Sequence, residues 1–139
     1  MTTNTHLDDI ASKLAAIKEL GEAFQHFGGA IGMLATSEFS AVRLVELLTH
    51  TCPSWEDTQH YNDIELPFRK RAWLCAAMVH GRFLSDPTRC IRDPESIPIA
   101  ADYRLPQFLQ ASGVLNYAQE LAKQVDQEQL ILSGSKQEI

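Results

Sequence analysis

The sequence predicts an all-α fold, with residues 1–139 forming a single-domain helical bundle. Apolar residues recur at steps of three and four, which is the spacing of one face of an α-helix. No segment alternates apolar and polar residues for more than a few positions, as a half-buried strand would. Glycine, proline and serine separate the periodic segments, and 139 residues suffice for one core but not for two domains.

The composition excludes several classes of protein. A net charge of −6 argues against a protein that grips the phosphates of long nucleic acids. No apolar run approaches the roughly 20 residues of a membrane span, and the first residues carry no secretory signature. Cys52, Cys75 and Cys90 are too widely spaced for a metal knuckle and too few for a disulfide framework. We therefore predict a cytoplasmic protein with no metal and no cofactor.

The first predicted helix runs from Thr5 to Phe27. Asn4 or Thr5 is expected to cap its start, and Gly28-Gly29 is expected to end it. Its apolar positions form one continuous stripe, which we expect to lie in the core: Leu7, Ile10, Leu14, Ile17, Leu20, Phe24 and Phe27.

A glycine-rich segment, residues 28–32, follows this helix. No lysine stands at the offset of a phosphate-binding loop and no strand precedes the segment, so we interpret it as a tight turn between helices. A second helix is predicted after Ser37 or Ser40, and Cys52-Pro53-Ser54 is expected to end it. Its buried face is expected to comprise Val42, Leu44, Val45, Leu47 and Leu48.

Residues 55–65 are predicted to be loop, and Pro67 suits the first position of a long, mostly buried helix from Phe68 to Phe83. Three cations, Arg69, Lys70 and Arg71, stand at the beginning of this helix. Positive charge there opposes the helix dipole, so we expect acidic side chains or a bound anion nearby.

The last third is predicted to contain three short helical segments. Asp93-Pro94-Glu95 is typical of a helix start, Pro106 is expected to begin a helix that Gly113 closes, and residues 117–125 form the last, with Leu121 and Val125 buried. Residues 135–138 have the form of a capping box, which predicts either a helix that the sequence does not continue or frayed terminal residues.

One stretch, residues 101–109, combines an acid, a base and aromatic residues ahead of a proline-started helix. Asp102 is the candidate for a chemical site, although from the residues alone the favoured interpretation is that it caps that helix or pairs with Arg104. For Tyr103 and Tyr117, core packing with a hydrogen-bonded hydroxyl is the favoured interpretation.

These motifs together resemble the queuosine salvage family, the queuosine 5'-phosphate N-glycosylase/hydrolases. The resemblance covers the chain from about Ile17 to Ile139. The matching segments are Phe27-Gly28-Gly29, residues 41–48, Lys70-Arg71-Ala72, the A-D-Y-R-L-P-Q block of residues 101–107, Gly113-Val114-Leu115 with Tyr117, Ser133-Gly134-Ser135, and Glu138-Ile139.

The resemblance implies an all-α fold similar to that of helix-hairpin-helix DNA glycosylases. It also implies a hydrolase that cleaves the N-glycosidic bond of queuosine 5'-monophosphate and releases queuine, within queuosine salvage and tRNA modification. Asp102 and Lys70 would be catalytic, and Arg71, Tyr103 and Arg104 would bind the substrate. The partner would be this small nucleotide, with no long nucleic acid and no membrane.

The sequence departs from the family pattern in specific places. Trp73 and Met78 stand where the family usually has a glutamine and an aspartate, and Ala100 stands where an aromatic is common. Family members also continue beyond both ends of the match, which implies that residues 1–139 are a portion of a longer family fold. The alternative function is therefore a truncated or non-catalytic helical relative, a binding or assembly module that self-associates or takes a partner supplying the missing elements. A DNA-type glycosylase is disfavoured by the acidic charge balance.

Overall fold

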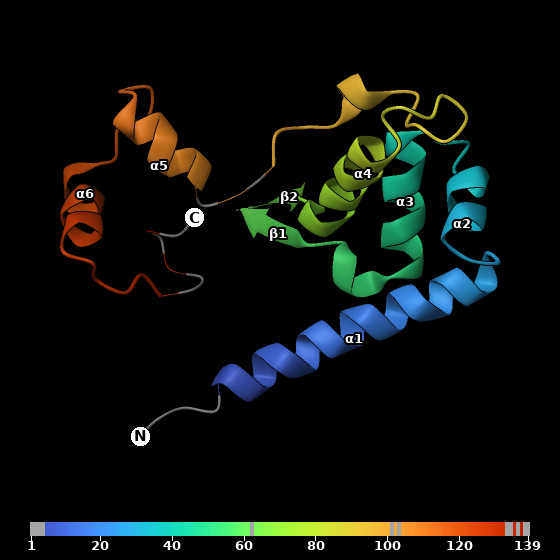
Figure 1. The fold of residues 1–139 in the computed structure, drawn as a ribbon. Coiled ribbons are helices and arrows are strands. Elements are labelled where there is room, and N and C mark those ends of the chain that lie inside the picture. Colours follow the sequence, from blue (N-terminus) through green and yellow to red (C-terminus); the bar gives the residue numbers. More distant parts are fainter. Residues whose placement is uncertain are drawn as a thin grey trace. The chain divides into compact units, whose positions relative to one another are not determined.

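The computed structural model describes residues 5–61, 63–100, 102, 104–132, 135 and 137. Three predictions fall outside these residues: the cap at Asn4, the complete capping box of residues 135–138 and the substrate-binding role of Tyr103. The elements follow one another along the chain as α1 (Thr5–His26), α2 (Ala30–Thr36), α3 (Ala41–Thr51), the 3-10 turn η1 (Pro53–Trp55), β1 (Thr58–Tyr61), β2 (Ile64–Pro67), α4 (Lys70–Arg82), η2 (Pro94–Ser96), α5 (Arg104–Ala111) and α6 (Gln119–Asp126) (Figure 1).

The predicted all-α class is wrong, because β1 and β2 pair in a small antiparallel sheet. The described chain is nevertheless mostly helical. The strands occupy the segment predicted as loop, and Pro67 ends β2 instead of beginning α4. Each strand has only four residues and β2 is exposed along its length, so burial imposes no alternation that periodicity would detect.

The described residues group into two compact units. The first comprises Met1–His60 and Ile64–Ala100, and the second comprises Tyr61–Asp63 and Ala101–Ile139. That the whole chain folds as one domain stays a prediction. Among the described residues, no helix is both long and apolar enough to cross a membrane.

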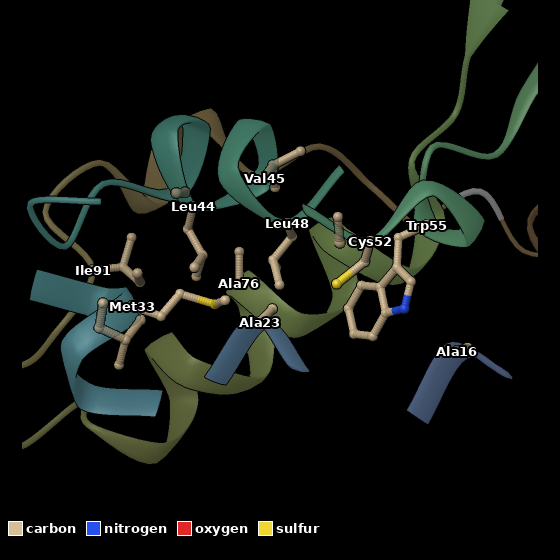
Figure 2. Close-up of a cluster of buried hydrophobic side chains, with 13 residues drawn as sticks. Ala16, Ala23, Met33, Leu44, Val45, Leu48, Cys52, Trp55, Ala76 and Ile91 are labelled. Carbon is tan, nitrogen blue, oxygen red and sulfur yellow. The ribbon is translucent and has the colours of Figure 1, made fainter. Parts of the chain in front are cut away.

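The core of the first unit lies where α3 packs against α4, with α1 and α2 alongside (Figure 1). Leu44 and Leu48 point from α3 toward Ala76 of α4 and Met33 of α2 (Figure 2). Alanine on α4 lets the two helix backbones approach closely, and the Ala76 side chain is wholly buried. Burial of these apolar side chains is the main term that stabilises the unit.

The glycine-rich segment forms the predicted turn between helices. Gly28 and Gly29 have φ of 72° and 105°, a region that side-chain-bearing residues rarely adopt. The short helix α2, which the sequence analysis did not predict, begins immediately afterwards. Ser40 then caps α3, where its hydroxyl accepts a hydrogen bond from the Arg43 N–H, and α3 ends before Cys52 as predicted.

Three of the predicted buried faces are only partly buried. On α3, Leu44, Val45 and Leu48 are buried, but Val42 is exposed. On α1, Leu20, Phe24 and Phe27 pack against the core, but Ile10, Leu14 and Ile17 are exposed, and Ile17 is 66% exposed. The predicted burial of Leu7 lies outside the described side chains. On α4, Ala72 and Ala76 are buried while Leu74 and Met78 are 49% and 67% exposed. The prediction of a mostly buried α4 is therefore wrong: the apolar residues encircle the helix, but only one side faces α3.

The second unit contains α5 and α6. Gly113, with φ of 72°, closes α5 as predicted. None of its described side chains is fully buried, and the predicted core residue Val125 is exposed while Leu121 is half-buried. An isolated segment of about 40 residues rarely stabilises itself without more burial than this.

Candidate active site

The predicted catalytic lysine begins α4. Lys70 is the first residue of the helix and is half-buried, and Arg69 before it is the N-cap. Arg69 adopts a left-handed backbone conformation, with φ of 50° and ψ of 33°. For a residue other than glycine this conformation costs about 1–2 kcal/mol, so neighbouring contacts must hold it.

Glu56 supplies one such contact. Its Oε1 accepts hydrogen bonds from both Nε and Nη2 of Arg69, at 3.1 and 2.7 Å. The expectation that an acid lies beside the cations at the start of α4 is thus confirmed for Arg69. Arg71 finds a different partner, because its Nη1 donates to the carbonyl oxygen of Ser54 at 3.1 Å.

Nothing in the sequence singled out Glu56 as the partner of Arg69. Glu56 and Arg69 lie on opposite sides of the β1–β2 hairpin, so they meet only if that hairpin forms. The only signal in the sequence was electrostatic: three adjacent cations at a helix start predict acidic side chains or a bound anion nearby, without indicating which residue.

Asp102 lies at the start of α5 and is partly exposed. Its Oδ1 accepts a hydrogen bond from the Arg104 N–H at 3.1 Å, and its carbonyl oxygen accepts one from the Leu105 N–H at 3.0 Å. These contacts orient the carboxylate as a helix-start cap would. Tyr103 lies outside the described residues, so its assignment to substrate binding stays a prediction.

The predicted site residues form two local groups. Lys70 and Arg71 share the first turn of α4 in the first unit, and Asp102 and Arg104 share the start of α5 in the second. A contact between Lys70 and Asp102 stays a prediction.

An apolar groove of about 590 Å³ runs along α4. Met78 lies in its wall, and Trp73, the other departure on this helix, packs against the core instead. The groove is lined by Trp55, Arg71, Leu74, Cys75, Met78, Val79, Arg82 and Phe83. It therefore continues the exposed apolar face of the helix.

A second hollow, of about 490 Å³, lies beside the Glu56–Arg69 pair. Glu46, Thr49 and His50 of α3 line it together with Pro53. Among the described residues, no group of three or more potential metal-binding side chains is close enough to hold an ion.

Cys52 and Cys75 are poorly suited to nucleophilic chemistry. Burial raises the pKa of the Cys75 thiol. Burial also raises the pKa of Cys52 and the charge of Glu19 adds to it, against a hydrogen bond with Thr51 that lowers it. Both thiols therefore stay protonated at neutral pH, and the thiolate is the reactive form.

Comparison with known proteins places this mostly helical chain in a family. The family model described as "Queuosine salvage protein" matches residues 1–139, and the chain belongs to this family. A Mus musculus relative named queuosine 5'-phosphate N-glycosylase/hydrolase is 34% identical over 116 residues, which are 83% of this chain and 34% of the relative. Relatives with the same name from Bos taurus and Sphaerobacter thermophilus are 29% and 30% identical, over 99% and 88% of this chain.

The chain spans well under half the length of these relatives, between 34% and 41% for the three. The similarity therefore concerns one portion of the longer proteins. What the longer proteins act on enters below as a proposal for this chain.

Proposed function

We propose that this chain hydrolyses the N-glycosidic bond of queuosine 5'-monophosphate and releases queuine. The observation that carries the proposal is membership of the queuosine salvage family along residues 1–139. Curated relatives from animals and a bacterium share the name queuosine 5'-phosphate N-glycosylase/hydrolase. We also propose a cytoplasmic location, because all three cysteines are free thiols.

The proposed reaction breaks the bond between the sugar C1' atom and the nitrogen of the base. The electron pair leaves with the nitrogen, which takes up a proton, and the hydroxyl of a water molecule bonds to C1'. The sugar becomes positively charged as the bond breaks, and the Asp102 carboxylate stabilises or traps that charge. Lys70 keeps Asp102 ionised and oriented, since a nearby cation favours the charged form of a carboxyl group.

Substrate binding is assigned to Arg71, Tyr103 and Arg104. A guanidinium group presents five N–H donors in a planar fork that matches phosphate oxygens. Arg71 directs one of its donors to Ser54, and its exposed side chain has further donors for the 5'-phosphate.

The direct test incubates the purified chain with queuosine 5'-monophosphate and follows free queuine by mass spectrometry. We expect release by the wild-type chain, and a decrease of about 100-fold or more in Asp102→Asn and in Lys70→Met, because each variant removes charge stabilisation from the transition state. Glu120→Gln is the matched control, since Glu120 is an exposed acid in the first turn of α6. Release by the wild type that does not exceed release by Asp102→Asn would refute the proposal.

A second candidate function is a non-catalytic binding or assembly module. It is favoured by the exposed apolar groove on α4 and by the lack of fully buried side chains among the described residues of the second unit. Sedimentation and light scattering test it, because a module of this kind is expected to self-associate as its concentration rises. A strictly monomeric, soluble chain would count against it.

A further inference from the structure

We propose that Glu56 is a positioning residue for Lys70: its ion pair with Arg69 sets the direction of the first turn of α4. The catalytic consequence rests on the proposed function, whereas the structural consequence does not. Glu56 touches neither substrate nor reacting atoms in this scheme and acts only through Arg69.

The contact constrains the Arg69 side chain strongly. Nε and Nη2 both donate to the same carboxylate oxygen of Glu56, at 3.1 and 2.7 Å, so the guanidinium cannot rotate without breaking one bond. Both side chains are about one third exposed, which limits screening by solvent and salt. A charge-assisted pair with this geometry is among the stronger side-chain hydrogen bonds.

A backbone contact reinforces the pair from the neighbouring residues. The N–H of Phe68 donates to the carbonyl oxygen of Asp57 at 3.0 Å. Asp57, like Arg69, has a left-handed backbone, with φ of 45°. These contacts close the base of the β1–β2 hairpin. We call the four residues that make them the hairpin clasp: Glu56, Asp57, Phe68 and Arg69.

The clasp acts on the helix through the Arg69 backbone. The carbonyl oxygen of Arg69 accepts the hydrogen bond from the Trp73 N–H at 3.0 Å, which begins the hydrogen-bonded ladder of α4. Lys70 is the next residue, so a change in the Arg69 φ or ψ angle re-aims Lys70. A catalytic group displaced by about 1 Å can lose as much as 100-fold in rate.

The same geometry separates the role of Arg69 from that of Arg71. The charge of Arg69 is directed to Glu56, which leaves the substrate-binding assignment on this helix to Arg71.

The test compares Glu56→Gln with the double variant Glu56→Gln/Arg69→Gly. Glycine adopts the left-handed conformation without a contact to hold it, so it should restore the helix start that Glu56→Gln loosens. We expect Glu56→Gln to lower kcat for queuine release about tenfold with KM within twofold, and the double variant to regain most of that loss. Glu46→Gln is the control, since Glu46 lines the same hollow as Glu56 and Arg69 but makes no hydrogen bond or ion pair with Arg69.

Amide hydrogen exchange at Trp73 gives a readout that does not need activity. We expect exchange about tenfold faster in Glu56→Gln and a return toward the wild-type rate in the double variant. Unchanged exchange in Glu56→Gln would overturn the inference, whether or not the chain is active. If Glu56→Gln exchanges faster but keeps its kcat in an active chain, the clasp has only a structural role. That result would overturn the proposal that Glu56 positions Lys70. If the wild type releases no queuine, the proposed function fails, and the exchange data alone decide whether the clasp sets the helix start.

Discussion

Asp93 joins two parts of the first unit that are distant along the chain. Its Oδ1 accepts a hydrogen bond from the Ala41 N–H at 2.6 Å, and its Oδ2 accepts one from the Ser40 hydroxyl at 2.8 Å. The order Asp93-Pro94-Glu95 predicts that Asp93 caps its own short turn, η2, but η2 has no side-chain cap. The carboxylate instead lies at the N-terminus of α3, where negative charge is favoured by the helix dipole.

Removing this carboxylate should destabilise the first unit. We expect Asp93→Ala to lower the free energy of unfolding by about 1–2 kcal/mol, because the start of α3 loses a charged hydrogen-bond acceptor. Urea unfolding followed by circular dichroism measures the change. Glu95→Ala is the control, since Glu95 is an exposed acid in the same turn, and an equal loss in both variants would contradict the role of Asp93.

The same contacts predict a pH dependence. Burial would raise the pKa of Asp93, but hydrogen bonds from Ala41, Ser40 and Val42 outweigh it and lower the pKa below the ordinary value of 3.8. The unfolded chain therefore binds the proton more readily than the folded chain. The contribution of Asp93 to stability is complete at pH values above its ordinary pKa, and it is lost as the pH falls through its lower pKa in the folded chain. We expect the stability difference between wild type and Asp93→Asn to shrink as the pH falls below about 4. Unfolding measured from pH 6 down to pH 2.5 checks this, and a constant difference would contradict it.

At the scale of the elements, the first turn of α2 has no room for a side chain at Gly32. A Cβ atom at Gly32 would overlap the backbone carbonyl oxygen of Phe27, which cannot move aside without disturbing the end of α1. Glycine is therefore required there for space, whereas Gly28 and Gly29 are required for their positive φ.

We expect Gly32→Ala to lower the free energy of unfolding by about 2 kcal/mol or more, as overpacking against backbone does. Gly81→Ala provides the control, because nothing lies within 4 Å of a Cβ at that position of α4. Alanine should stabilise that helix by up to about 1 kcal/mol. Thermal unfolding of both variants checks the opposite signs, and a neutral Gly32→Ala would show that the turn relaxes.

At the scale of the whole molecule, a net charge of −6 favours solubility, while the groove on α4 exposes apolar surface. Met78 stands in the groove and is 67% exposed, so it contributes little to the core. The groove thus promotes self-association of the isolated chain or provides a binding surface for a partner.

We expect Met78→Glu to reduce concentration-dependent self-association while changing the free energy of unfolding by less than about 0.5 kcal/mol. Light scattering over a concentration series measures the mass, and denaturant unfolding measures the stability. Leu130→Glu is the control, because Leu130 is 86% exposed but does not line the groove. An equal effect of both variants would point to general charge repulsion instead of a specific apolar surface.

The sequence by itself determined the local features of this protein. It predicted α1, α3 and the Gly28-Gly29 turn, because helical periodicity, caps and glycine conformations act over about four residues. It also supported the family, because the blocks around Lys70 and Asp102 are contiguous motifs. Only the tertiary structure decided the β1–β2 hairpin, the Glu56–Arg69 pair and the cap that Asp93 provides for α3. The pair and the cap join residues that are distant in the chain, and the short exposed strands of the hairpin leave no periodic signal. The tertiary structure also decided the exposure of Met78, since an apolar residue on a helix is buried only where another element covers it.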